Sequence, residues 1–304
     1  MLQRMPALRR SNGAALTRSK RQPLRSFRRA SLACIVLVLL PLLVHARSGS
    51  RSSPYRILIT NDDGVRAPGI LAVAQALQGL GEITIVAPSE NQSGKGHALT
   101  IGEPIYTDPI MLPAGLTATA VTATPASCVK VAVEALMKDR PDLVVSGINR
   151  GYNLGVVAYV SGTVAAAREA ALMGIPSIAS SLAIEQNDYG PAAQIVRQIA
   201  EQVKEHGLNR GVFLSVNVPS GVPGGLKGIR VATQSHQTGE EHFEEQKTPW
   251  GRRYFWSVWK DPSHDDEGTD VWATSHGYAA VTPLHATEFD REAYDTWRKR
   301  LSER

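Results

Sequence analysis

Cysteine is scarce in this chain, which has only Cys34 and Cys128 among its 304 residues. This scarcity excludes a disulfide-rich scaffold and a metal centre built from several cysteines. Cys34 lies in an amino-terminal leader, so removal of the leader leaves one thiol and no possible internal disulfide. The remaining 258 or so residues (304 − 46) are numerous enough to be stabilised by a hydrophobic core.

Acidic residues are missing from the first 46 positions, which carry nine basic side chains. These are Arg4, Arg9, Arg10, Arg18, Lys20, Arg21, Arg25, Arg28 and Arg29. The formal net charge of +5 therefore becomes 5 − 9 = −4 for residues 47–304. A negatively charged folded part gives no support for binding to a nucleic-acid polymer.

The apolar run at 32–43 is shorter than the roughly 20 residues that a membrane-spanning helix needs. It follows the basic region and precedes Val44-His45-Ala46, a small-residue cleavage pattern. We therefore predict that residues 1–46 are an export signal and that the protein is periplasmic or otherwise exported. Two alternatives stay open, namely an uncleaved amino-terminal membrane anchor and a cytoplasmic protein.

Runs rich in valine and isoleucine alternate with helical patterns beyond the leader. This alternation predicts an α/β fold in which crossover helices join the strands of a doubly wound, mostly parallel sheet. The expected strands are 56–60, 83–86, 104–111, 117–123, 142–146, 176–179 and 212–216. The expected helices are 68–80, 127–138, 161–173 and 189–206. We assign residues 47–304 to one domain.

The pattern changes from about residue 229. Residues 250–259 are aromatic and alternating, and we predict that Val271–Thr274 pairs with them as a hairpin within 229–285. The hairpin either folds onto its own domain or forms an arm against another subunit. We favour the arm, because a peripheral hairpin cannot easily bury so many large aromatic side chains.

Two adjacent carboxylates, Asp62 and Asp63, follow the apolar run 56–60. In open α/β sheets, ligands bind in the crevice at the carboxyl ends of the strands. Neighbouring carboxylates raise each other's pKa, and a divalent cation commonly keeps both ionised. The pair indicates a metal site, although a helix cap followed by a turn at Gly64 explains the four residues 61–64 equally well.

Polar loops also follow two other expected strands, at 91–94 and 149–163. A hard cation such as Mg²⁺ or Mn²⁺ prefers oxygen ligands, which these loops offer. Ser161-Gly162-Thr163 opens a helix, where free backbone N–H groups attract anions. A metal site next to an anion site suggests phosphate ester chemistry.

Several motifs together resemble the SurE survival-protein nucleotidases, in order from about residue 55 to 285. They are residues 57–64, Ala87-Pro88, 91–94, 124–129, 146–155, 161–164, Gly277-Tyr278 and 282–284. The resemblance implies a Rossmann-like α/β domain with a carboxyl-terminal arm that forms dimers or larger assemblies. It also implies metal-dependent phosphatase activity on nucleoside monophosphates.

The resemblance also implies the roles of individual residues. The metal ligands would be Asp62, Asp63, Ser93 and Asn149. The phosphate would be held by Asn91, Ser161, Gly162 and Thr163, and the catalytic residues would be Asp62, Asp63 and Asn91. The chain departs from the family at Val160 and Val156-Val157, where tyrosine and polar residues are common, so base or sugar preference is the property most open to change.

We therefore expect a metal-dependent 5'/3'-nucleotidase, with Mg or Mn as cofactor, that forms a homodimer or homotetramer through its arm. Asp62 or Asp63 would orient or deprotonate the attacking water. One alternative is a phosphatase with an aspartyl-phosphate intermediate, although its usual Asp-x-Asp spacing is absent. The other is a non-catalytic Mg-binding receiver or ligand-binding module, which usually needs an acceptor Asp and a Lys where this chain has Asn149 and Thr282. The histidines, His97 included, are interpreted as solvated residues.

Overall fold

The computed structural model describes residues 54–185 and 187–302. The predicted export signal at 1–46 lies outside these residues and stays a prediction. Among the helices that are described, none combines the length and the apolar character that crossing a membrane requires.

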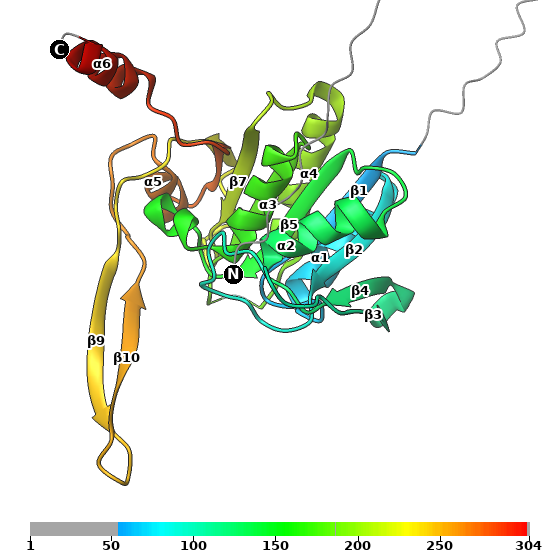
Figure 1. Ribbon diagram of the computed structural model, residues 1–304, viewed down its shortest axis with the longest axis horizontal. Helices are drawn as coiled ribbons and strands as arrows, with labels where there is room; N and C mark the ends of the chain where they lie inside the picture. The colour runs from blue at the N-terminus through cyan, green and yellow to red at the C-terminus, as the bar shows by residue number, and fades with distance from the viewer. Residues whose placement is uncertain (1–53, 186, 303–304) are drawn as a thin grey trace, which may run out of the picture. The chain divides into compact units, whose positions relative to one another are not determined.

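A nine-stranded sheet forms the centre of the described domain, in the order β3-β4-β2-β1-β5-β6-β7-β11-β8 (Figure 1). Its strands are β1 (Arg56–Thr60), β2 (Glu82–Pro88), β3 (Thr107–Met111), β4 (Thr117–Val121), β5 (Leu143–Arg150), β6 (Ser177–Leu182), β7 (Val212–Val218), β8 (Ile229–Val231) and β11 (Ala279–His285). Only the β3–β4 and β7–β11 ladders are antiparallel within it. The predicted doubly wound, mostly parallel sheet is confirmed.

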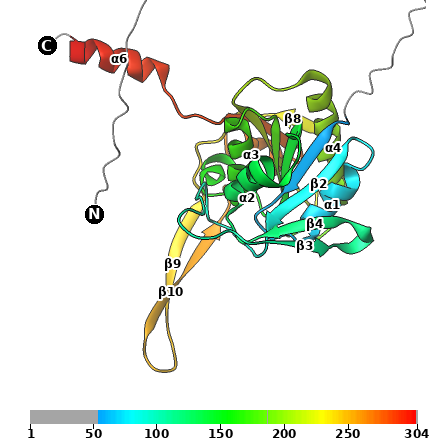
Figure 2. The same cartoon turned by 45° about the vertical axis from the view of Figure 1, so that its right-hand side comes forward.

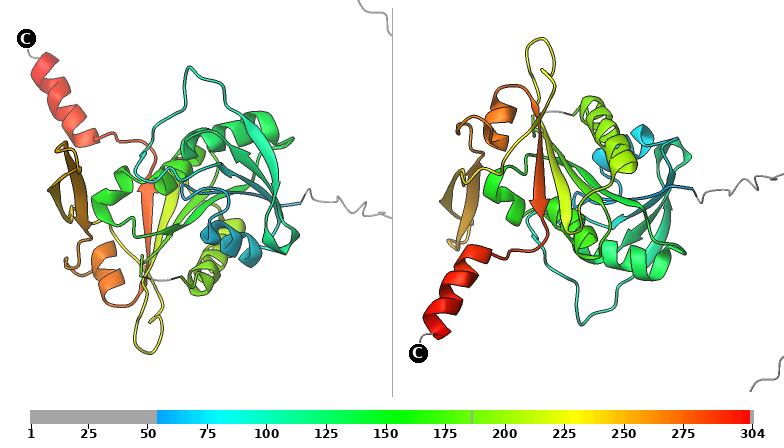
Figure 3. Two further views of the ribbon diagram at one scale, coloured as in Figure 1. Left: turned by 90° about the horizontal axis from the view of Figure 1, so that it is seen from below. Right: turned by 90° about the horizontal axis from the view of Figure 1, so that it is seen from above.

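Helices cover both faces of the sheet, as Figure 3 shows. They are α1 (Pro68–Ala76), α2 (Pro125–Val131), α3 (Gly162–Leu172) and α4 (Gly190–His206), and α2 runs into a π-helical turn at Ala132–Leu136. α1 and α4 pack in one hydrophobic cluster, whereas α2 and α3 pack in another. Two short 3-10 turns, Pro113–Gly115 and Gly155–Tyr159, lie in the connections.

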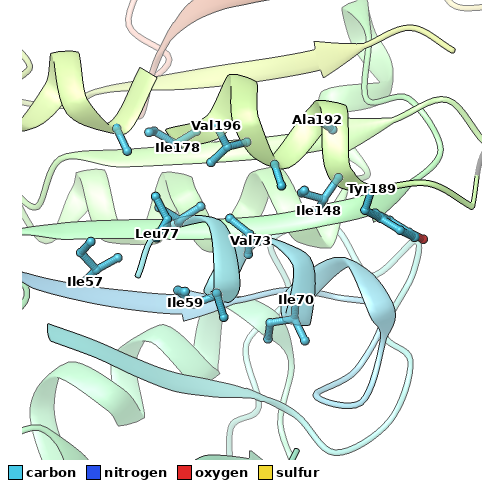
Figure 4. Close-up of a cluster of buried hydrophobic side chains, with 14 of the residues drawn as sticks. Ile57, Ile59, Ile70, Val73, Leu77, Ile148, Ile178, Tyr189, Ala192 and Val196 are labelled. Carbon is cyan, nitrogen blue, oxygen red and sulfur yellow. The ribbon is translucent and has the colours of Figure 1, made fainter. Parts of the chain in front are cut away.

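Strand β1 shows why the sequence folds in this way. Ile57 and Ile59 are fully buried in the cluster that contains α1 and α4, and Leu58 is fully buried in the cluster that contains α2 and α3. Successive side chains of a strand point to opposite faces, so a strand buried on both faces must be apolar throughout. Figure 4 shows Ile57 and Ile59 beside the side chains of α1.

The predicted pairing of Val271–Thr274 with the aromatic strand is wrong. These residues belong to α5 (Asp270–Ser275), which Thr269 caps by accepting a hydrogen bond from the Trp272 N–H at 3.2 Å. An oxygen-bearing side chain at this position stabilises the helix start and prevents an extended strand. Val271 and Ala273 are buried on the domain rather than in a ladder.

The aromatic strand β10 (Arg253–Lys260) pairs instead with β9 (Glu240–Lys247), and the two form a separate antiparallel hairpin. Figures 1 and 2 show this hairpin projecting away from the central sheet. Every residue of β9 is exposed, which is why its glutamate-rich sequence did not indicate a strand. The last helix, α6 (Arg291–Ser302), also has no buried residue.

The core at the end of β5 gives a stability prediction. Ile148 is fully buried beside α1 and directly precedes Asn149 (Figure 4). Ile148→Ala should lower the free energy of unfolding by about 2–5 kcal/mol, because it removes buried methylene groups and leaves a cavity. Urea unfolding measures this loss. Ile101→Ala, at a position that is 79% exposed, is the control and should change the midpoint little; equal effects would contradict the described packing.

Candidate active site

The three polar loops predicted from the sequence start from neighbouring strands. β1 lies between β2 and β5, and Thr60 at the end of β1 is in register with Ser146 of β5. Asp62 follows β1, Asn91 follows β2, and Asn149 lies in β5, which extends past its expected end at residue 146. Because the three strands are parallel, these residues are carried to the same edge of the sheet.

Asp62 is a buried carboxylate, only 3% exposed. The Thr163 hydroxyl donates a hydrogen bond to its Oδ1. Burial raises the pKa of Asp62, while hydrogen bonds from the Thr163 side chain and from the backbone at Thr163 and Gly162 act in the opposite direction. Burial disfavours the charged form of Asp62, and the hydrogen bonds at the start of α3 stabilise that form.

Gly162 makes this arrangement sterically possible. A Cβ at this position would lie 2.8 Å from Cβ of Asp62 and 3.0 Å from its Oδ2. Ser161 caps α3 by accepting a hydrogen bond from the Val164 N–H at 3.1 Å. The turn predicted to bind phosphate is thus divided, since Gly162 and Thr163 contact Asp62 and Ser161 lines a cavity.

Asp63 is partly buried, and its Oδ2 accepts a hydrogen bond from the Arg150 N–H at 3.1 Å. Burial, with a further contribution from the charge of Asp62, raises the pKa of Asp63 to about 6. A carboxylate that titrates so close to neutrality is suited to gaining and losing a proton.

The second loop is attached to this acidic pair. The Gln92 N–H donates to the backbone oxygen of Asp62 at 2.7 Å. Asn91 Oδ1 accepts from the Ser93 N–H at 2.9 Å, a turn that fixes the two residues relative to each other. The side chains of Asn91 and Ser93 belong to exposed residues and are accessible to a ligand.

Asn149 is buried, and its Nδ2 donates to the Gly151 carbonyl at 2.8 Å. This bond uses the amide nitrogen and keeps Oδ1 available as an acceptor. Asp62, Ser93, Asn149 and Ser161 all line one cavity of about 520 Å³. Asp63, Asn91, Gly162 and Thr163 are connected to that group by the hydrogen bonds and contacts described above. A second cavity of about 580 Å³ contains none of these eight residues.

The donor set fits a hard divalent cation. Two carboxylates, a hydroxyl and an amide oxygen are ligands that Mg²⁺ and Mn²⁺ accept. Three further buried oxygens at these strand ends, Thr60 Oγ1, Asn61 Oδ1 and Ser146 Oγ, have no hydrogen-bond partner among the described residues. Within the same residues no group of three or more His, Cys, Asp or Glu side chains could hold a metal ion.

Comparison with known proteins identifies the family of this chain. The family model described as survival protein SurE matches residues 57–241. The chain belongs to the SurE family. It is 43% identical over 232 residues to the 5'-nucleotidase SurE of Cytophaga hutchinsonii, covering 75% of this chain and 89% of that protein. It is 44% identical over 233 residues to the 5'-nucleotidase SurE of Geotalea daltonii, covering 76% and 92%.

The crystal structure of the SurE protein from Aquifex aeolicus is similar to this fold, with a TM-score of 0.69 and 36% identity. The match covers 79% of this chain and 97% of that chain. The resemblance drawn from the motifs is therefore confirmed. Dimer or tetramer formation through the arm stays a prediction.

One interaction in this SurE family member differs from expectation. His97, interpreted from the sequence as solvated, is only 23% exposed in its side chain, and its Nε2 lies 2.8 Å from Glu169 Oε2. Lys130 Nζ lies 3.1 Å from the other oxygen of Glu169. The hydrogen bond from His97 is the main cause that lowers the pKa of Glu169. These contacts connect the loop that carries Ser93 to α2 and α3.

Other residues that line the cavity were not among the predicted site residues. Arg150, Tyr152, Ile184, Trp259 and Asp261 belong to this group, and the last two come from β10 and the residues just after it. The aromatic alternation indicated a hairpin, but only the folded chain shows that the hairpin reaches the cavity.

Glu169→Gln should reduce stability by about 1–3 kcal/mol at pH 7, because it weakens two hydrogen bonds to a buried charged group. The folded-state pKa of Glu169 is lowered, so this contribution is present above the unfolded value near 4.5 and is lost as the pH falls through the lower folded value. Denaturant titrations at several pH values measure it. Glu201→Gln, which removes a more exposed ion pair with Arg197, is the control and should reduce stability by less than about 0.5 kcal/mol. An equal loss of stability in both variants would argue against a stabilising role for the contacts of Glu169 with His97 and Lys130.

Proposed function

We propose that this chain is a divalent-metal-dependent 5'-nucleotidase, a phosphomonoester hydrolase that converts nucleoside monophosphates to nucleosides and phosphate. The main support is the buried Asp62, which lines one cavity of about 520 Å³ with Ser93, Asn149 and Ser161. Its neighbour Asp63 accepts a hydrogen bond from Arg150, which lines the same cavity. That volume lies within the range of pockets that enclose small molecules. Relatives at 43–44% identity carry the name 5'-nucleotidase SurE.

The metal ligands in this proposal are Asp62, Asp63, Ser93 and Asn149, and the cation is Mg²⁺ or Mn²⁺. When bound, such a cation supplies Lewis acidity toward the phosphoryl group and offsets the negative charge of the site. The oxygen-only donor set supports this assignment.

The remaining steps are assigned to side chains of this chain. Asp63, which the Arg150 N–H positions through a hydrogen bond, orients the attacking water or accepts its proton. Asn91 Nδ2 donates a hydrogen bond to a phosphoryl oxygen, because Asn91 Oδ1 is already used by Ser93. Ser161 supplies a hydroxyl at the cavity wall, whereas Gly162 and Thr163 hold Asp62 in place.

Asp62→Asn should lower kcat for nucleoside monophosphates by at least about a hundredfold with the fold intact, because it removes a buried negative charge from the site. Phosphate release from AMP measures the loss, and circular dichroism checks the fold. Asp188→Asn, an exposed carboxylate that hydrogen-bonds Gly190 outside the cavity, is the matched control and should retain parental activity. Parental turnover by Asp62→Asn would refute the assignment.

Metal binding itself can be measured without substrate. Mn²⁺ or Mg²⁺ should raise the melting temperature of the chelator-treated protein at pH 7.5, because a ligand that binds only the folded state stabilises it. The gain should shrink at pH 5, where protonation of Asp63 below its pKa of about 6 competes with the cation. Differential scanning fluorimetry checks both points. An equal gain for the Asp62→Asn/Asp63→Asn double variant would show that the cation binds elsewhere.

A further inference from the structure

The cavity beside the acidic pair has a second, chemically different lining. Besides Asp62, Ser93, Asn149 and Ser161, it is lined by Tyr152, Val157, Val160, Ile184 and Trp259. The first group suits a cation and a phosphate, but the second group is largely apolar. An apolar wall does not favour the binding of an isolated phosphate, but the base of a nucleotide can pack against it.

Trp259 is the largest side chain of this wall, and it is held in a defined orientation. Its Nε1–H donates to Asp261 Oδ1 at 2.8 Å. Its ring also packs against Gly239, where a Cβ would lie only 2.7 Å from the indole Cζ2 and where φ is +73°. The side chain is nevertheless 43% exposed, so part of the indole is free to contact a ligand.

Acidic groups near this apolar wall determine which part of a nucleotide can bind against it. Burial raises the pKa of Tyr152, and the negative charges of Glu185 and Asp261 raise it further. Tyr152 therefore stays a neutral hydrogen-bond donor among carboxylates. These carboxylates would repel a phosphate but can accept hydrogen bonds from a base or sugar.

We propose that Trp259 of the β9–β10 hairpin is the platform on which the base of a nucleoside monophosphate stacks, while the phosphate lies at Asp62, Ser93 and Asn149. This proposal rests on the proposed nucleotidase function and names the part of the chain that recognises the nucleoside. The hairpin then has a role in substrate selection within its own chain, in addition to any contact with another subunit.

The comparison of AMP with ribose 5-phosphate tests this role, because the two share the phosphate ester and differ by the base. In Trp259→Leu the ratio of kcat/KM for AMP to that for ribose 5-phosphate should fall about tenfold, chiefly through KM for AMP, since stacking of a base on an aromatic ring contributes about 1–3 kcal/mol. Trp259→Phe, which keeps an aromatic ring, should retain most of the ratio.

Trp256→Leu is the matched control, because Trp256 lies on the same strand, is 59% exposed and does not line the cavity. Its ratio should equal that of the parent. A parental ratio in Trp259→Leu, or an equal fall in both variants, would overturn the proposal. A parent that hydrolyses neither ester would instead refute the proposed function.

If Trp259→Leu does not fold, tryptophan fluorescence of the parent protein provides a second test. AMP should quench the tryptophan fluorescence of the parent and of Trp256→Leu in the presence of Mg²⁺, and ribose 5-phosphate should not. Equal responses to the two esters would overturn the stacking role.

Discussion

The burial of the Asp62 charge is the constraint on which the rest of the site depends. A carboxylate that is 3% exposed needs strong compensation, because removal of a charge from water costs several kcal/mol. The start of α3 provides that compensation through Thr163 and the backbone at Gly162. The absence of a side chain at Gly162 allows the approach, and the second loop is attached through the Gln92 N–H to the Asp62 backbone oxygen.

The amino terminus of α3 binds the Asp62 carboxylate, and this bears on where a phosphate can be recognised. A helix start is a general anion site, and here the anion closest to it is a carboxylate of the protein itself. In the proposed function, recognition of a phosphate ester then falls to Asn91, Ser161 and a cation rather than to the whole Ser161–Thr163 turn. The contact between His97 and Glu169 keeps the loop that carries Ser93 close to the same helix.

In the proposed stacking role, the hairpin gives the site a second source of selectivity. Asp62, Ser93 and Asn149 of the strand-end loops offer small polar groups, which suit the ester and the cation of the proposed function. Trp259 comes from a distant part of the chain and adds an aromatic surface to the same cavity. In these proposals chemistry and substrate selection are carried by separate elements. Val157 and Val160, two positions at which the sequence departs from the pattern expected of the family, line the same cavity.

The sequence by itself determined seven of the nine strands of the sheet and the acidic pair, because strands buried on both faces must be apolar at successive positions such as Ile57, Leu58 and Ile59. It also located Asp62, Asp63 and Asn149 at strand ends, since that pattern is local. It misassigned Val271–Thr274 and did not predict β8, β9 or β11. Strand β9 has no local hydrophobic pattern, because it is exposed and mostly charged. Only the tertiary structure decided that Thr163 contacts Asp62, that His97 pairs with Glu169, and that Trp259 reaches the cavity. Those contacts join residues about 70 to 200 positions apart, and they depend on how the packed layers bring distant segments together rather than on any neighbour in the chain.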